Sequence, residues 1–244
     1  MAEIDLDRLA DSYAHRPPSG ASLQRAKDAG GKLTAGSRIL DVGGGPGNHS
    51  VVWLQQGHEP IVLDPSRGML ETARRRGLDI VRGRAQALPF REATFSLVWF
   101  HLSIHYGDWR RSIDEAVRVL AVRGRIDIWT LGPDHHGQSL LARWFPSIAE
   151  IDAERFPDPE ALTTHLRCQI PTVSVAHSIE VVTREAGSWI TAVEAGFVST
   201  LQLLSDDERR SGIEAAKRHY PDPAEELDYE LRFTRITADR RPSG

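Results

Sequence analysis

The residues best suited to chemistry are two acids and a group of glycines in the first third of the chain. Asp41 ends an apolar run and is followed at once by four closely spaced glycines, Gly43, Gly44, Gly45 and Gly47. Glycine permits sharp turns with positive φ and leaves no Cβ between the backbone and a ligand. A strand, a glycine turn and a helix N-terminus together form a nucleotide-binding corner. The run therefore predicts such a corner around Asp41.

The second acid, Asp64, ends the next apolar run, and Pro65 follows it as a typical first helical residue. A carboxylate at that position can accept both hydroxyl protons of a ribose, and it can also cap the helix. The corner itself fits a dinucleotide or S-adenosylmethionine. Asp41 is more informative, because a pyrophosphate gains nothing from a carboxylate there, whereas a ligand with a sulfonium and an ammonium group does.

Two histidines and a tyrosine follow the predicted strand over 94–100, the fourth in the chain: His101, His105 and Tyr106. They are candidate site residues, because ligands bind at the carboxyl ends of strands in open α/β sheets. A histidine there can take a proton from a hydroxyl or amine near neutral pH. We assign His105 as the candidate general base, His101 to the cofactor pocket and Tyr106 to the acceptor.

A second polar group follows the predicted strand over 125–130, the fifth in the chain: Asp134, His135 and His136. Adjacent histidines in a loop point in different directions, and no third ligand lies at a helical spacing, so we expect no metal site. His135 is instead a candidate acceptor contact. Trp189, in a late helical segment rich in apolar residues, is a second candidate for that role.

Apolar segments alternate with amphipathic ones through the first half of the chain. One predicted strand ends near Asp41, and the others cover 59–64, 78–82, 94–100 and 125–130; the predicted helices cover 4–16, 22–29, 49–56, 67–76 and 109–120. This alternation indicates βαβ units on a parallel sheet. We expect residues 122–124 to form a turn and residues 132–137 a loop.

The second half of the chain is predicted to place helices between two late strands. The strands cover 172–183 and 229–236, and the helices cover 160–167, 185–195 and 206–219. We interpret the inserted helices as a cap over the substrate side of a single domain, 1–244. Its parts are N-terminal helices (1–32), the cofactor-binding core (33–132), the late strand with the cap (133–228) and the final strand (229–237).

Composition restricts the class of partner. The 244 residues carry a formal net charge of -4, which does not suggest binding to nucleic-acid phosphates. The single cysteine excludes an internal disulfide and suits a reducing compartment. No apolar run approaches the roughly 18 residues of a membrane span, and residues 1–16 lack a signal-peptide core. We therefore expect a cytoplasmic protein that acts on a small molecule.

Several segments resemble, in the right order, the motifs of the class I S-adenosylmethionine-dependent methyltransferases. Asp64 falls where that family has its ribose-binding acid. Residues 40–47 resemble the family's first motif, and residues 83–90 resemble its adenine-side motif. Residues 95–105 resemble its fourth strand, and residues 115–120 resemble the helix before its fifth strand. The similarity is continuous from about Ile39 to Thr130.

The resemblance implies a doubly wound, mostly parallel α/β sheet of seven strands with an antiparallel hairpin at one edge. It implies in-line transfer of a methyl group from S-adenosylmethionine to a small acceptor, which leaves S-adenosylhomocysteine. Met69 would supply an apolar wall for adenine, and Arg16 would meet the cofactor carboxylate. The implied cofactor site comprises Tyr13, Arg16, Asp41, Gly43, Gly44, Gly45, Gly47, Asp64, Pro65, Met69, Arg84, Ala85, Gln86, Phe100 and His101.

Two positions depart from the family pattern. Arg84 stands where an acid or amide usually contacts adenine, and Ser96 replaces an acid. The adenine contact would then rest on the backbone of Ala85 and the amide of Gln86. Two other functions stay open, a methyltransferase fold that binds without transfer and a nicotinamide-dependent oxidoreductase. The acceptor, the methylated atom and the oligomeric state do not follow from the sequence.

Overall fold

The computed structural model describes residues 4–7, 10 and 17–241. The chain divides into two compact units, which are described separately. The sheet unit comprises residues 18–130, 157–178 and 234–244, and the helical unit comprises residues 1–17, 131–156 and 179–233.

The strands form a seven-stranded sheet in the order β3-β2-β1-β4-β5-β7-β6. They are β1 (Arg38–Val42), β2 (Glu59–Asp64), β3 (Asp79–Arg82), β4 (Phe95–His101), β5 (Leu120–Leu131), β6 (Val173–Glu185) and β7 (Glu226–Asp239). The first five strands pair in parallel, with β1 between β2 and β4. The late strands add an antiparallel hairpin, so the predicted mixed α/β sheet is confirmed.

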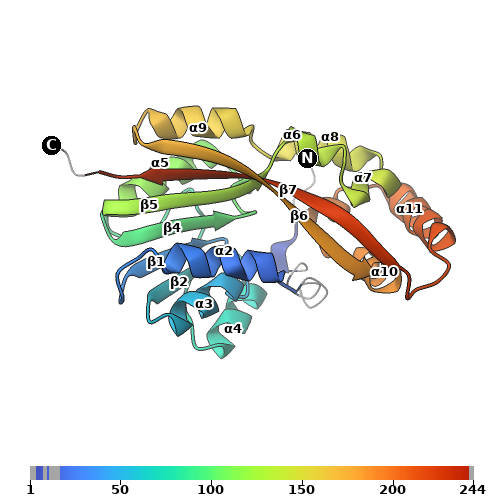
Figure 1. Cartoon of the computed structure of the whole chain (residues 1–244), viewed down its shortest axis with the longest axis horizontal. Helices are drawn as coiled ribbons and strands as arrows, with labels where there is room; N and C mark the ends of the chain where they lie inside the picture. Colours follow the sequence, from blue (N-terminus) through green and yellow to red (C-terminus); the bar gives the residue numbers. More distant parts are fainter. Residues whose placement is uncertain (1–3, 8–9, 11–16, 242–244) are drawn as a thin grey trace. The chain divides into compact units, whose positions relative to one another are not determined.

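Helices cover both faces of the parallel strands in the sheet unit (Figure 1). α2 (Gly20–Gly30), α3 (Asn48–Gln55) and α4 (Arg67–Arg75) lie on one face, and α5 (Trp109–Val119) and α9 (Pro159–Arg167) on the other. Side chains alternate across a strand, so Leu40 and Val42 join the apolar core beneath α5 and α9. Asp41 therefore points to the opposite face, where α2 and α3 pack.

The helical unit buries its own apolar core. Its helices are α6 (Pro133–His136), α7 (Leu140–Trp144), α8 (Ser147–Arg155), α10 (Ala186–Glu194), the 3-10 helix η2 (Ser199–Gln202) and α11 (Asp206–His219). Phe145 and Trp189 are almost fully buried in this core. Gly212 of α11 packs so closely that an added Cβ would lie 2.3 Å from a ring carbon of Phe145. The residue must therefore be glycine for α11 to approach that ring.

Two predicted features differ in the structure, and one helix was not predicted. Residues 122–124 do not separate helix from strand, because β5 starts at Leu120 and contains an irregularity between its pairings with Phe95 and Leu97, with Arg123 at φ 68°. The loop over 132–137 is instead the short helix α6, which begins at Pro133 with its preset φ. α8 was missed, because its apolar positions give only a weak amphipathic pattern. The predicted helix over 4–16 lies largely outside the described residues.

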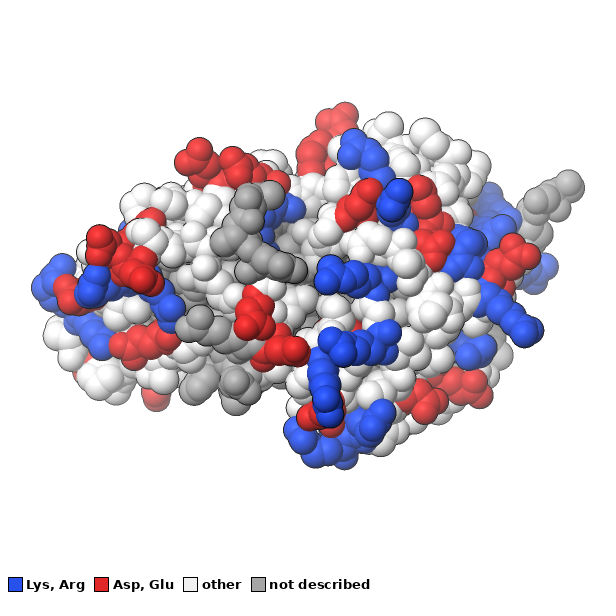
Figure 2. All heavy atoms as spheres, turned by 180° about the vertical axis from the view of Figure 1, so that it is seen from behind, with Lys and Arg blue, Asp and Glu red and all other residues white. Residues whose placement is uncertain are grey.

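The described surface carries mixed charge. Figure 2 shows acidic and basic side chains interspersed over the face that it draws, as a net charge of -4 allows. Among the described helices, none combines the length and apolar character that crossing a bilayer requires.

Candidate functional site

The glycine turn after β1 has the conformation that the sequence predicts. Gly43, Gly45 and Gly47 have φ of 66°, 55° and 78°, a region that other residues rarely adopt. The chain itself also needs some of these glycines. A Cβ on Gly44 would lie 2.5 Å from the carboxyl carbon of Asp41, and one on Gly47 would lie 2.2 Å from Leu78. Close packing therefore explains part of the pattern that we interpreted as ligand binding.

Asp41 lies directly beneath this turn and is only 1 % exposed. One of its carboxyl oxygens accepts a hydrogen bond from the Ser50 hydroxyl at 2.7 Å. Burial raises the pKa of Asp41 from 3.8 to about 7; the Ser50 bond opposes that rise, and the charge of Asp64 adds to it. The site thus contains a buried carboxyl group that changes charge near neutral pH. Ser50 was missed by sequence reasoning.

Asp64, the last residue of β2, holds the turn by hydrogen bonds. Its Oδ2 accepts the backbone N–H of Gly45 at 3.0 Å, and its Oδ1 accepts that of Ser66 at 2.9 Å. These two bonds use both carboxyl oxygens and fix the orientation of the carboxylate at the turn. The helix cap expected at Asp64 lies two residues later in the structure. Ser66 caps α4 through Met69 N–H, and Pro65 precedes the helix.

The predicted adenine-side residues lie on the loop after β3. Arg84 is exposed, whereas Ala85 and Gln86 are half-buried. The Gln86 amide donates a 2.7 Å hydrogen bond to the Tyr106 carbonyl, so the loop is fastened to the segment after β4. Met69, in the first turn of α4, is buried as expected of an apolar wall.

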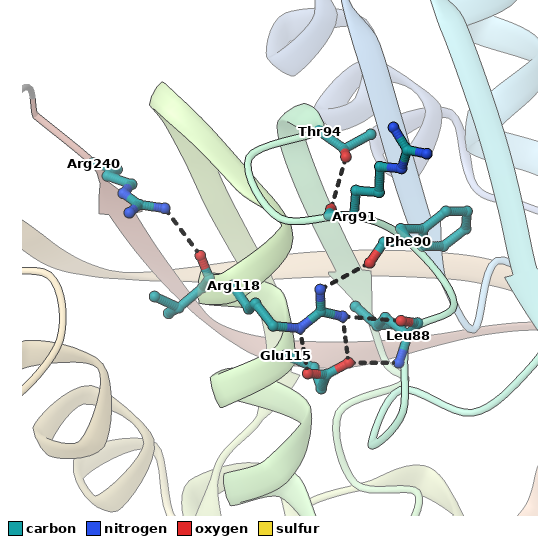
Figure 3. Close-up of polar contacts among 8 residues, drawn as sticks. Leu88, Phe90, Arg91, Thr94, Glu115, Arg118 and Arg240 are labelled. Atoms are coloured by element: carbon teal, nitrogen blue, oxygen red, sulfur yellow. Dashed lines mark hydrogen bonds and ion pairs between the residues drawn. The ribbon is translucent and has the colours of Figure 1, made fainter.

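Two residues of α5 hold the end of the same loop (Figure 3). Arg118 pairs with Glu115 and donates to the carbonyls of Phe90 and Leu88 at 2.8 and 2.9 Å. Glu115 in turn accepts the Leu88 N–H at 2.7 Å, and its hydrogen bond from Arg118 lowers its pKa. The residues that resemble a family motif in α5 therefore position the loop that carries Ala85 and Gln86.

The residues after β4 meet the turn after β1. Ser103 donates to the Val42 carbonyl at 2.6 Å, which ties the two strand ends together. His105 and Tyr106 are half-buried, with ring centroids 4.2 Å apart. Phe100 is fully buried in the core on the α5 side, so the structure gives its side chain a packing position.

A basic and aromatic group, which we call the Arg25 cluster, lies on the α2 side of the β4 and β5 ends. It comprises Ser22, Arg25, His49, His101 and Trp129. Arg25 lies 4.5 Å over the Trp129 ring, and its Nη1 is 3.5 Å from His101 Nε2. The His49 and His101 rings are 4.6 Å apart, and Ser22 Oγ is 2.7 Å from His49 Nε2. Sequence reasoning identified only His101 of this group.

His49 is uncharged at neutral pH. Burial, with a smaller contribution from the positive charge of Arg25, lowers its pKa to about 4. A guanidinium can only donate hydrogen bonds, so in the contact with Arg25 the His101 Nε2 atom is the acceptor. The Arg25 guanidinium therefore lies beside the Trp129 indole and the His101 imidazole.

The remaining predicted residues lie elsewhere. His135 and Trp189 belong to the helical unit, where both are buried. His135 Nδ1 accepts the Arg232 N–H at 3.3 Å, and burial lowers the pKa of His135 to about 4. Tyr13 and Arg16 lie outside the described residues. Within the described ranges, no three His, Cys, Asp or Glu residues are grouped so that they could hold a metal ion.

Comparison with known proteins identifies the family. Residues 40–128 match a family described as a methyltransferase domain. The chain is 30 % identical over 183 residues to a malonyl-[acyl-carrier protein] O-methyltransferase of Erwinia billingiae. This match covers 71 % of this chain and 70 % of that protein. It is 34 % identical over 133 residues to the enzyme of the same name from Enterobacter lignolyticus, and this match spans about half of each chain (53 %).

The fold likeness extends over most of the chain. A solved structure described as a methyltransferase of an antibiotic biosynthesis pathway from Anabaena variabilis superposes with a TM-score of 0.71. It is 19 % identical and covers 88 % of this chain and 96 % of that one. The chain therefore belongs to the class I S-adenosylmethionine-dependent methyltransferases.

Proposed function

We propose that this protein binds S-adenosylmethionine at the turn after β1 and transfers its methyl group to a small-molecule acceptor by in-line displacement. The observation that carries the proposal is the pair of buried carboxyl groups, Asp41 and Asp64, that bracket Gly44 and Gly45. Two acids in contact with a glycine turn suit a ligand that has both ribose hydroxyls and positive charge. When bound, the cofactor supplies a methyl group on a sulfonium, which is electrophilic.

Different residues of the chain bind different parts of the cofactor. Asp64 accepts the ribose hydroxyls while it holds the turn through Gly45. Asp41 faces the positive charge, and Ser50 fixes its carboxyl group. Ala85, Gln86 and Met69 receive the adenine on the loop that Arg118 holds. We also assign Pro65, Arg84, Phe100, His101, Tyr13 and Arg16 to this site as predictions, and the burial of Phe100 favours an indirect contribution by packing.

The acceptor side rests on less direct support. We propose that His105 accepts a proton where the acceptor must lose one, because it is half-buried beyond the β4 end. Tyr106 adjoins it and is assigned to acceptor binding. His135 and Trp189 stay predictions for acceptor contact; Trp189 is 1 % exposed, which favours a packing role. In-line transfer requires mainly proximity and alignment from the enzyme.

Calorimetric titration with S-adenosylhomocysteine tests the first step. Asp64→Asn removes a charged acceptor, and hydrogen bonds to charged groups contribute about 1.5–3 kcal/mol, so affinity should fall roughly 10- to 100-fold. Asp79→Asn, an exposed acid at the start of β3, is the matched control and should leave affinity unchanged. Absence of binding by the unmodified protein would contradict the proposal and favour a scaffold. Binding of NADH in its place would favour an oxidoreductase.

Transfer itself is tested by the formation of S-adenosylhomocysteine in the presence of candidate acceptors. The relatives named above suggest including a malonyl thioester beside phenols and amines. His105→Gln should slow transfer to phenols and amines, which lose a proton, and should spare a carboxylate acceptor, which has none to lose. Equal rates for the variant and the unmodified protein with every acceptor would remove His105 from the mechanism.

A further inference from the structure

Residues 102–107, which we call the β4–α5 segment, are held in an unusual conformation within the sheet unit. Leu102 has a φ of 53°, in the left-handed region that residues other than glycine rarely adopt. Such strain persists only where the surrounding structure imposes it, and it collects at functional sites. Ile104 is 1 % exposed and anchors the middle of the segment in the core. The segment also carries His105 and Tyr106, which we assign to the acceptor side.

One end of the β4–α5 segment is fastened to the glycine turn. The Ser103 hydroxyl donates to the Val42 carbonyl at the end of β1. A Cβ on Gly43 would lie 2.6 Å from the Cβ of Ser103, so the turn and the segment touch with no room for a side chain between them. The position of this end therefore depends on the turn that receives the cofactor.

The other end of the segment is fastened to the adenine-side loop through Gln86. The Gln86 amide donates its 2.7 Å hydrogen bond to the Tyr106 carbonyl, one residue after the candidate base. Gly107 follows with a φ of 85°, and a Cβ there would lie 2.3 Å from Gln86 Nε2. Both the backbone conformation and the close approach of Gln86 thus require glycine at this position.

The Tyr106 carbonyl also fixes which way the Gln86 amide points. A carbonyl can only accept, so the amide nitrogen faces it and Oε1 is left on the other side of the amide. Among the residues that the structure describes, none donates a hydrogen bond to this oxygen. The side chain is half-buried, so a ligand can reach it. The exocyclic amino group of adenine is a donor and suits Oε1, whereas Arg84 on the same loop has no acceptor to offer.

We propose that Gln86 is a positioning residue that couples adenine binding to the acceptor side of the site. Its Oε1 accepts a hydrogen bond from the adenine amino group while its Nε2 holds the Tyr106 carbonyl. An amide that accepts at its oxygen becomes a stronger donor at its nitrogen, because hydrogen bonds in a chain polarise one another. A bound cofactor therefore tightens the β4–α5 segment and fixes His105 and Tyr106. This inference rests on the proposed function and adds how the cofactor prepares the site for the acceptor.

Hydrogen exchange of the backbone amides of residues 102–109, measured by mass spectrometry on the whole chain, reports on this coupling. The quantity is the ratio of exchange rates without and with saturating ligand. The ligands are S-adenosylhomocysteine and S-inosylhomocysteine, in which an oxygen replaces the amino group. Gln86→Glu keeps an acceptor for adenine and loses the donor to Tyr106, whereas Gln86→Leu loses both. Gln169→Leu is the matched control, because the exposed Gln169 amide also donates a 2.7 Å hydrogen bond, to Asp114.

We expect S-adenosylhomocysteine to slow exchange in the unmodified protein and in Gln169→Leu by roughly three- to tenfold, the effect of about one hydrogen bond. S-inosylhomocysteine should slow exchange much less. Gln86→Glu should keep its affinity for S-adenosylhomocysteine within about threefold and lose the slowing. Gln86→Leu should lose the slowing together with roughly three- to tenfold in affinity.

Three outcomes would overturn the inference and leave the proposed function standing: no slowing when S-adenosylhomocysteine is bound, a slowing that survives in Gln86→Glu, or equal slowing by the two ligands in the unmodified protein. The comparison of ligands needs no variant, so it decides even where a substitution prevents folding. Failure of the unmodified protein to bind S-adenosylhomocysteine would instead refute the proposed function.

Discussion

The charge state of Asp41 should make cofactor affinity depend on pH. Burial places the pKa of this carboxyl group at about 7. A carboxyl group with that pKa is about 9 % ionised at pH 6 and about 91 % ionised at pH 8. A cationic ligand interacts favourably with the ionised form only. Affinity for S-adenosylmethionine should therefore rise roughly tenfold from pH 6 to pH 8, which is about 1.4 kcal/mol.

Comparison with the reaction product isolates the contribution of the sulfonium. S-adenosylhomocysteine carries the same ammonium group but a neutral thioether, so its affinity should rise less than that of S-adenosylmethionine over the same interval. The ratio of the two affinities is the quantity to measure, by calorimetry at pH 6, 7 and 8. Asp41→Asn keeps an acceptor for the Ser50 hydroxyl and removes the titration, so both curves should become flat.

The same group should affect the stability of the free protein, with the opposite sign. Its folded pKa of about 7 exceeds the reference value of 3.8, so the folded state holds a proton that the unfolded state has lost. Stability is greatest below the lower value and falls as pH rises toward the folded pKa, by at most about 4 kcal/mol. Urea unfolding of Asp41→Asn should lack this loss. A flat affinity of the unmodified protein for S-adenosylmethionine, or a rise that survives in Asp41→Asn, would refute the reasoning.

Other substitutions test separate parts of the structure. Ser50→Ala removes the bond that lowers the Asp41 pKa, so the midpoint of the affinity curve should move to higher pH by about one unit, measured in the same titrations. Arg118→Lys removes the planar guanidinium that holds the adenine-side loop, so affinity for S-adenosylhomocysteine should fall several-fold. The free energy of unfolding should fall by only about 1 kcal/mol, because the Arg118 side chain is 37 % exposed. Gly212→Ala should lower the free energy of unfolding by about 1–3 kcal/mol despite the better helix propensity of alanine, because its Cβ would meet an aromatic ring. Gly20→Ala, with open space around it, is the control and should not destabilise the protein; equal urea midpoints for the two variants would contradict the packing that we describe.

The sequence predicted the elements whose signal is local. The strands that end near Asp41 and at Asp64, and the helices before and after them, appear within one or two residues of their expected bounds, because apolar periodicity and glycine stops are properties of short segments. The helix α6 and the irregular start of β5 were missed. In both places a short segment of turn-forming residues adopts regular secondary structure because of the elements that pack against it.

The amino-acid sequence by itself determined that a glycine turn lies between two acids at the ends of adjacent strands, since residue types at fixed spacing carry that information. Only the tertiary structure decided what those acids touch. Asp41 accepts the Ser50 hydroxyl because helix α3 packs on that face of the sheet, and Asp64 accepts the Gly45 N–H because β2 pairs beside β1. The Arg25 cluster belongs wholly to the tertiary structure. No local pattern relates Arg25 to Trp129; they stack because tertiary packing brings α2 and β5, which are distant in the chain, together.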